Sequence, residues 1–189
     1  MISAMLGHAL DKPLSAISGR IRVHPNVITV AGFLITLIGA ALIPVSLAAG
    51  GIVIAAGSLL DMLDGAVARA NNKTSRFGAF LDSLLDRYSD AAIFIALAWR
   101  FYTRGDAAAA AACVFTMTGA LLISYARARA EGVGKECRAG LMERPERLLL
   151  LVIGCVFGVI RPVVWALLVL THLTVAQRVR HVWKQCRDE

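Results

Sequence analysis

Five aspartates occur where the surrounding chain is apolar: Asp61, Asp64, Asp82, Asp86 and Asp90. Asp61 and Asp64 are three residues apart and Asp82 and Asp86 are four apart, so each pair lies on one helix face, about a turn apart. A carboxylate inside a membrane helix costs roughly 3 kcal/mol and rarely persists without a partner, an ion or a water-filled cavity. The spacing therefore predicts that two facing helices bring Asp61, Asp64, Asp82 and Asp86 together around a cation.

The donor atoms of this predicted site are all carboxylate oxygens. Such hard ligands suit Mg²⁺ or Mn²⁺, which usually keep waters or substrate phosphates in their coordination shell. No His or Cys is close in sequence, which disfavours zinc. Small residues leave room beside the aspartates for close helix approach or for a bulky nucleotide (Gly65, Ala68 and Gly78). Arg69, one turn beyond Gly65, is placed to bind a phosphate through two hydrogen bonds.

Two explanations other than catalysis compete for the same aspartates. The first is a buried ion-pair network, but five carboxylates with only Arg69 and Arg87 nearby do not balance in charge. The second is an ion or proton transporter. The acids crowd near one end of their helices, away from the midplane, and neither broken helices nor inverted repeats are apparent in the sequence. Both features disfavour transport.

The composition places most of this chain in lipid. Hydrophobic residues make up 58% of 189 residues, 17% are charged, and the mean hydropathy is +0.67. A soluble domain of this size could not hide so much apolar surface. The net charge of +7 is split into short basic clusters between apolar stretches, which fits anionic head groups and argues against nucleic acid as a partner. The four cysteines show no metal-binding spacing and are predicted to be free thiols.

The expected fold is an all-α integral membrane protein with six transmembrane helices preceded by an amphipathic surface helix. Residues 1–22 carry apolar side chains at helical spacing on one side, as a helix lying on the membrane surface does. Residues 23–189 then hold the six spans, the first of them capped by Asn26. The Ala48–Gly51 stretch is expected to form a turn, and Arg161-Pro162 to separate the last two spans. The expected spans are about 27–45, 52–70, 77–101, 107–129, 146–159 and a sixth ending near 180.

Six spans put the N-terminus, the 70–77 loop, the 130–145 loop and the C-terminus on one side of the membrane. That side carries 16 Lys and Arg residues, and the opposite side carries three, namely Arg100, Arg104 and Arg161. The asymmetry predicts a multi-pass protein of the cell membrane whose aspartates face the cytoplasm.

Together the site residues spell Asp61-x2-Asp64-Gly65-x2-Ala68-Arg69-x8-Gly78-x3-Asp82-x3-Asp86. This pattern resembles the signature of the CDP-alcohol phosphatidyltransferase family, with each of its eight positions filled across 26 residues. The resemblance covers essentially the whole chain, since the family also has six membrane helices after a surface helix. It implies an enzyme that moves a phosphatidyl group from CDP-diacylglycerol to an alcohol, with two Mg²⁺ or Mn²⁺ ions, generally as a homodimer.

The resemblance also implies roles for individual residues. Asp61, Asp64 and Asp82 would bind metal, and Asp86 would share a metal and act as the base that deprotonates the attacking hydroxyl. The CDP moiety would be contacted by Gly65, Arg69 and Ser75, with Gly78 beside them, and by the His24–Val27 stretch that contains Asn26. Asp90 lies outside the signature and receives no role.

The acceptor is indicated by the basic second half of the chain. Residues 124–131 and 143–148 resemble the phosphatidylinositol-phosphate synthases of bacteria and archaea, which use inositol 1-phosphate. By this resemblance Arg127, Arg129 and Arg144 would bind the acceptor phosphate, and Arg178 or Arg180 would complete the pocket. Converging guanidinium groups repel one another unless an anion sits among them. Glycerol 3-phosphate is the main anionic alternative. If the arginines serve membrane topology alone, serine or free inositol becomes an open alternative.

Overall fold

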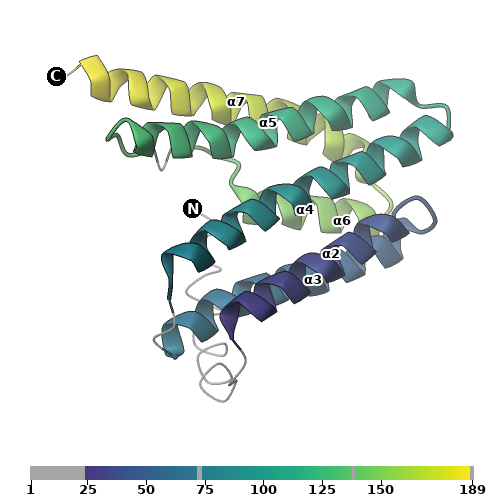
Figure 1. Ribbon diagram of the computed structural model, residues 1–189. Coiled ribbons are helices and arrows are strands. Elements are labelled where there is room, and N and C mark those ends of the chain that lie inside the picture. Colours follow the sequence, from purple (N-terminus) through teal and green to yellow (C-terminus); the bar gives the residue numbers. More distant parts are fainter. Residues whose placement is uncertain (1–23, 72–73, 138, 188–189) are drawn as a thin grey trace.

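The computed structural model describes residues 24–71, 74–137 and 139–187, and all of their regular elements are helices. Six helices alternate in direction: α2 (Pro25–Leu42), α3 (Leu47–Ala70), α4 (Arg76–Thr103), α5 (Ala107–Gly132), α6 (Arg144–Val156) and α7 (Ile160–Arg187). Figure 1 shows α2 beside α3 on one side of the bundle and α5 beside α7 on the other, with α4 and α6 between the two pairs.

Glycines bring α2 and α3 into close contact. A Cβ atom at Gly57 would lie 2.3 Å from Thr36 Oγ1 and 2.9 Å from the carbonyl oxygen of Gly32. Two helical turns after Gly32 on α2, a Cβ at Gly39 would lie 2.8 Å from the backbone nitrogen of Ile54. Small residues at seven-residue spacing on both helices therefore let the two backbones touch, as membrane helices commonly do. This contact fixes α3, and with it Asp61 and Asp64, against α2.

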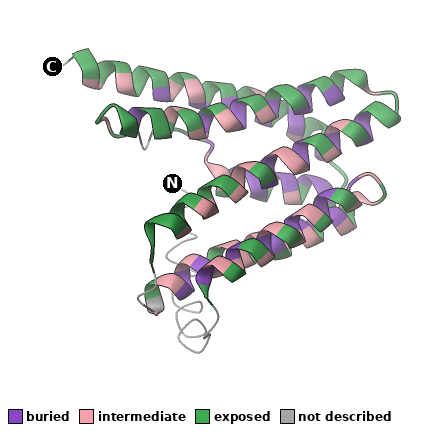
Figure 2. Cartoon of the chain, viewed as in Figure 1, coloured by how far each residue is buried: buried purple, intermediate pink, exposed green. Residues whose placement is uncertain are grey.

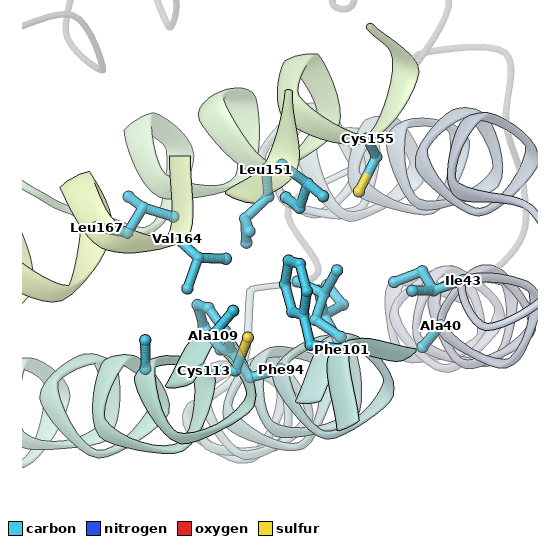
Figure 3. Close-up of a cluster of buried hydrophobic side chains, with 14 of the residues drawn as sticks. Ala40, Ile43, Phe94, Phe101, Ala109, Cys113, Leu151, Cys155, Val164 and Leu167 are labelled. Atoms are coloured by element: carbon cyan, nitrogen blue, oxygen red, sulfur yellow. The ribbon is translucent and has the colours of Figure 1, made fainter. Parts of the chain in front are cut away.

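A hydrophobic core joins the other helices behind the aspartates. Phe94 on α4 is buried in one cluster with Leu151 of α6 and Val164 of α7 (Figure 3), and Leu97 on α4 belongs to the same cluster. Cys113 and Cys155 contribute to the same core, and all four cysteines are free, as predicted. The core holds α4 at a fixed position between the two helix pairs.

Two helix starts differ from the sequence prediction. Asn26 does not cap α2, because the N-cap is His24, whose Nδ1 accepts a hydrogen bond from the Asn26 backbone nitrogen at 3.3 Å. The Ala48–Gly51 stretch is not a turn but the first turn of α3, capped by Ser46. Its glycines serve packing, because a Cβ on Gly51 would lie 2.7 Å from the Cβ of Cys155 on α6.

The position of the turn before α7 also differs from the sequence prediction. Arg161-Pro162 lies within the first turn of α7, where proline is tolerated because its missing N–H has no intrahelical acceptor. The chain turns instead at Gly158, whose φ of 72° is readily adopted only by glycine.

Four of the six described helices are long and apolar enough to cross a membrane: Pro25–Leu42, Leu47–Arg69, Ala107–Gly132 and Ile160–Arg187. The six-span count was too high by this criterion. Helix α6 has 13 residues and reaches roughly 20 Å, short of a hydrocarbon core of about 30 Å. Helix α4 has 28 residues but carries four charged side chains within positions 82–90. The predicted surface helix lies in residues 1–22, outside the described part of the chain.

The outward faces of the helices suit a lipid environment. Figure 2 shows exposed residues along the outer sides of α5 and α7, and many are large and apolar, including Phe115, Leu122 and Val169. The alternation of helix direction gathers the basic residues of positions 127–135, 144–147 and 178–187 at the same end as the first turns of α2 and α4. The protein is thus an all-α multi-pass membrane protein with one basic end.

Candidate active site

Three carboxylates from two helices meet near the basic end of the bundle. Asp61 and Asp64 on α3 and Asp82 on α4 each offer an oxygen, and these oxygens all lie within 4.8 Å of one another. Asp64 is buried, whereas Asp61 and Asp82 are half-buried. Three converging oxygen donors fit the chemistry of Mg²⁺ or Mn²⁺, which can complete their shells with water or phosphate. The predicted facing of the two helices is therefore present, and the residues fit a divalent ion.

Asp64 is held by a residue that the sequence analysis did not identify. The Thr29 hydroxyl on α2 donates a hydrogen bond to Asp64 Oδ2 and lies 3.1 Å from the Pro25 carbonyl oxygen, both in a buried setting. A hydrogen-bonded partner of this kind fixes which way a metal-binding carboxylate points. The signal in the sequence was weak, since a threonine within a membrane helix is ordinary.

Asp86 lies outside the three-carboxylate group and contacts an arginine instead. Arg144, the first residue of α6, forms ion pairs with both Asp61 and Asp86, and its Nη1 lies 2.6 Å from Asp86 Oδ1. Arg87 Nη1 is 3.6 Å from the other Asp86 oxygen. Asp86 thus lies between the Asp61–Asp64–Asp82 cluster and a group of arginines, which places a carboxylate at the boundary of two regions.

A cavity of about 210 Å³ opens on one side of the aspartate cluster. We call it the Asn26 cavity. It is bordered by Thr29, Asp64 and Asp82, and all five residues predicted to contact the nucleotide line it: Asn26, Gly65, Arg69, Ser75 and Gly78. Residues from α2, α3 and the start of α4 therefore converge on one polar space, although they are separated by up to 52 positions in sequence.

Close packing shapes the wall of the Asn26 cavity. Ser75 caps α4, and its Oγ accepts a hydrogen bond from the Gly78 backbone nitrogen at 2.9 Å. A Cβ at Gly78 would lie 3.0 Å from Asn26 Oδ1 and 3.0 Å from Ser75 Oγ. Glycine is thus needed at position 78 for the two polar side chains to sit against the backbone of α4.

A second cavity of about 240 Å³ opens on the other side of Asp86. We call it the Arg178 cavity. Arg127, Arg144, Arg147 and Arg178 line it, together with Asp86 and Asp90. Two of the three arginines predicted for the acceptor phosphate are therefore present. Arg129 is exposed and does not line this cavity, and Arg180 lines a different one with His181 and Lys184.

Arg178 is held rigidly in the wall of this cavity. Its side chain is 3% exposed, its Nε donates to the Ala139 carbonyl oxygen at 2.9 Å, and its Nη1 donates to the Ile123 carbonyl oxygen at 2.5 Å. Glu143 lies 3.8 Å from Nη2. These two hydrogen bonds to backbone carbonyls fix the orientation of the buried guanidinium, so its positive charge lies in the wall of the cavity.

Arg147 and Asp90 were the residues of this site that sequence reasoning missed or left without a role. Both line the Arg178 cavity and form a buried ion pair with each other. A signal was available, because Arg147 is three residues after Arg144 and Asp90 is four after Asp86, which places each on the same helix face as a predicted site residue.

Comparisons with known proteins agree on one family. Residues 22–177 match the model described as CDP-alcohol phosphatidyltransferase. The archaetidylinositol phosphate synthase of Pyrococcus horikoshii is 38% identical over 165 residues, 86% of this chain and 85% of that protein. The phosphatidylinositol phosphate synthase of Mycobacteroides abscessus is 37% identical over 183 residues, 92% of this chain and 83% of that protein.

Solved structures of the Mycobacterium tuberculosis phosphatidylinositol phosphate synthase are similar along nearly the whole chain. The structure with CDP-DAG bound has a TM-score of 0.82 at 34% identity and covers 93% of this chain and 94% of that one. The structure in complex with manganese and citrate has a TM-score of 0.83 at 34% identity and covers 92% and 88%.

Proposed function

The chain belongs to the CDP-alcohol phosphatidyltransferase family, and we propose that it transfers a phosphatidyl group from CDP-diacylglycerol to inositol 1-phosphate, releasing CMP. The observation that carries this proposal is the pair of cavities that flank one set of aspartates. The Asn26 cavity is bordered by Asp64 and Asp82, and the Arg178 cavity is bordered by Asp86 and five arginines. A transferase with two substrates needs such a donor space and acceptor space on either side of its reacting centre.

The Asn26 cavity suits the CDP end of the donor. Asn26 and Ser75 supply neutral polar groups, and Gly65 and Gly78 leave the backbone accessible. Arg69 contributes a guanidinium, the side chain best suited to bind phosphate through two hydrogen bonds. The diacylglycerol chains would remain in lipid beside the bundle. The relative with CDP-DAG bound supports this assignment, since it is similar over 93% of the chain.

Asp61, Asp64 and Asp82 would hold a divalent ion, Mg²⁺ or Mn²⁺, and two such ions are proposed with Asp86 as a further ligand. Bound there, the metal would supply positive charge to the pyrophosphate as negative charge develops on the departing CMP. The relative whose structure contains manganese supports the assignment. Thr29 would keep Asp64 oriented for this role.

Asp86 would act as the base. An oxygen of its carboxylate takes the proton of the acceptor hydroxyl, whose oxygen forms a bond to the phosphorus that carries the diacylglycerol. The bond from that phosphorus to the CMP oxygen breaks, and CMP leaves with the bonding electrons. Arg144 Nη1, 2.6 Å from Asp86 Oδ1, would hold the carboxylate in position for this step.

The charge of the Arg178 cavity favours an anionic acceptor. Arg127, Arg144, Arg147 and Arg178 all line it, and only some of this charge is balanced by Asp86, Asp90 and Glu143. A phosphate group would satisfy several guanidinium groups at once. The named relatives that use an inositol phosphate head group support inositol 1-phosphate over glycerol 3-phosphate, serine and free inositol.

The setting of this reaction is also proposed. Residues 1–22 would lie on the membrane surface as an amphipathic helix, and residues 23–189 would form the catalytic domain. The basic end would face the cytoplasm of a cell membrane. A homodimer is the proposed assembly.

CMP release by the purified protein tests the proposal. With CDP-diacylglycerol and Mg²⁺, we expect release when inositol 1-phosphate is added, and loss of release on addition of a chelator. Asp86→Asn should lower the rate about 10²- to 10⁴-fold, the usual contribution of a general base, and leave CDP-diacylglycerol binding intact. Asp106→Asn, the same change at the opposite end of the bundle, serves as the matched control. Release that requires serine, free inositol or glycerol 3-phosphate would refute the assigned acceptor.

A further inference from the structure

Asp90 and Arg147 form an ion pair that is almost completely enclosed. The Arg147 side chain is 2% exposed and the Asp90 side chain is 3% exposed. They come from α4 and α6, 57 positions apart in sequence, and meet on the wall of the Arg178 cavity. Two charges withdrawn from water in this way are costly unless their remaining polar atoms are also satisfied.

The pair leaves several of its polar atoms unsatisfied. Arg147 Nη2 donates to Asp90 Oδ2, but a second, parallel hydrogen bond is missing. Asp90 Oδ1 and the Arg147 Nε and Nη1 atoms are buried without a hydrogen-bond partner in the part of the chain that the structure describes. One acceptor oxygen and two donor nitrogens of the pair are therefore left without a hydrogen bond. Burying such groups without a partner is unfavourable, so a polar occupant is expected.

The unpaired atoms of Asp90 and Arg147 indicate which chemical group could bind between them. Asp90 is one helical turn beyond Asp86 on the same face of α4, which separates their Cβ atoms by about 5–6 Å. A hydroxyl group can donate to Asp90 Oδ1 and accept from an Arg147 N–H at the same time. Hydroxyls on non-adjacent carbons of a six-membered polyol ring are separated by a comparable span, so one can face Asp86 while another reaches Asp90.

We propose that Asp90 and Arg147 bind a second hydroxyl of the acceptor, so that the enzyme selects phosphorylated polyols by a hydroxyl that takes no part in the reaction. This rests on the proposed function and adds a specificity site to it. The phosphate of the acceptor lies beside Arg127, which is exposed, and Arg144, which is half-buried. The Asp90–Arg147 pair binds a hydroxyl on the polyol ring. A site built to hydrogen-bond a substrate hydroxyl discriminates strongly against analogues that lack it, because its own polar groups are then left unpaired.

The test pairs enzyme variants with acceptors that each lack one hydroxyl. Wild-type protein and Asp90→Asn are assayed by CMP release with inositol 1-phosphate and with its single deoxy analogues. We expect Asp90→Asn to lower kcat/KM for inositol 1-phosphate about 10- to 100-fold, mainly through KM for the acceptor. One deoxy analogue should show the same loss with wild-type protein, and Asp90→Asn should add no further loss with that analogue. KM for CDP-diacylglycerol should stay unchanged.

Several outcomes would overturn the proposal. If Asp90→Asn lowers the rate equally with every analogue, the pair has only a structural role. If wild-type protein tolerates removal of every hydroxyl except the attacking one, water fills the site. Should Asp90→Asn unfold because Arg147 is left as a buried lone charge, Asp90→Asn/Arg147→Met removes both charges, and the same analogue series is run on it with thermal unfolding as the folding control.

Failure of the proposed function gives a different result. In that case wild-type protein releases no CMP with inositol 1-phosphate, and the series is run with glycerol 3-phosphate and its two deoxy analogues. Coupling between Asp90 and one glycerol hydroxyl would support the hydroxyl site although the assigned acceptor is wrong. A requirement for an acceptor with a single hydroxyl, such as serine, would refute both.

Discussion

Thr29 on α2 donates its hydroxyl hydrogen to Asp64 on α3, 35 residues further along the chain. The bond is possible because glycines on both helices bring the two backbones together, with Gly57 packed against Gly32 and Thr36. A side chain of α2 thereby fixes the one buried carboxylate of the three that converge. The close approach of α2 and α3 therefore helps to set the orientation of Asp64 within the Asp61–Asp64–Asp82 cluster.

Removal of this hydroxyl should weaken metal binding. Thr29→Val keeps the shape of the side chain but leaves Asp64 Oδ2 without its donor. Loss of such a supporting hydrogen bond typically costs 10- to 100-fold in metal affinity. We expect a shift of this size in the Mn²⁺ concentration needed for half-maximal activity, and a matching shift in Mn²⁺ bound as followed by electron paramagnetic resonance. Thr29→Ser retains the donor and should bind Mn²⁺ nearly as wild type does. Equal affinity of the Val variant would show that Asp64 is held by other contacts.

Gly78 should be sensitive to the smallest possible enlargement. In Gly78→Ala the new methyl group would lie 3.0 Å from both Asn26 Oδ1 and Ser75 Oγ, so both side chains must shift by a few tenths of an ångström at the wall of the Asn26 cavity. Overpacking of this kind costs roughly 1–3 kcal/mol. We expect KM for CDP-diacylglycerol to rise about 10-fold, with a smaller change in KM for the acceptor.

Gly132→Ala is the matched control for this substitution. It also adds a methyl group to a helical glycine, but its nearest neighbour would be Arg129 Nη1 at 4.0 Å. Its KM values should equal those of the wild type. If Gly78→Ala binds CDP-diacylglycerol normally, the Asn26 cavity does not receive the nucleotide.

The sequence was sufficient to predict the site where residues lie close together along one helix face. Asp61 and Asp64, three apart, converge with Asp82 as expected, and the five predicted nucleotide residues share one cavity. Arg129 does not line the Arg178 cavity, because it is two residues after Arg127, which turns it about 200° around the helix. Its predicted contact with the acceptor phosphate stays a prediction. The role of Asp86 as a metal ligand stays a prediction, since its contacts are with Arg144 and Arg87.

The helix count and boundaries depended on packing that one sequence does not reveal. The Ala48–Gly51 stretch has the composition of a turn, yet it is helical because Gly50 and Gly51 are pressed against α2 and α6. The expected span at about 146–159 corresponds to α6, which ends at Val156 after 13 residues and is too short to cross a hydrocarbon core of about 30 Å. Thr29 and Arg147 were overlooked because their importance arises from partners on other helices, 35 and 57 positions away.

Arg100 should stabilise the end of the bundle that is remote from the site. It is buried near the end of α4, and its Nη1 donates to the carbonyl oxygens of Ile43 at 2.8 Å and Pro44 at 2.9 Å, just after α2. Arg100→Met would leave these carbonyls without their donor and should lower the free energy of unfolding by about 1–3 kcal/mol. Thermal unfolding in detergent measures this loss. Arg104→Met, at an exposed position four residues later, should have little effect. A comparable loss in both variants would assign the effect to net charge.

Asp106 should make the same end of the bundle sensitive to acid. The hydrogen bond from Arg161 Nε at 2.7 Å, and a second from the Ala109 backbone nitrogen at 3.0 Å, hold the pKa of Asp106 below its usual range. Because the pKa is lower in the folded protein, the carboxylate stabilises the fold above the unfolded-state pKa of about 4. That contribution is lost as the pH falls through the lower, folded-state pKa. Asp106→Asn keeps an acceptor for Ala109 but does not titrate.

The difference in thermal midpoint between wild-type protein and Asp106→Asn therefore measures the effect of this carboxylate alone. We expect the wild type to be the more stable at pH 6, and the difference to shrink as the pH is lowered towards 3. High salt should also reduce it at pH 6, because the ion pair with Arg161 is exposed to solvent and is screened. If the difference is the same at pH 6 and pH 3, the ionised form of Asp106 does not stabilise the start of α5, and its capping hydrogen bond alone accounts for any loss.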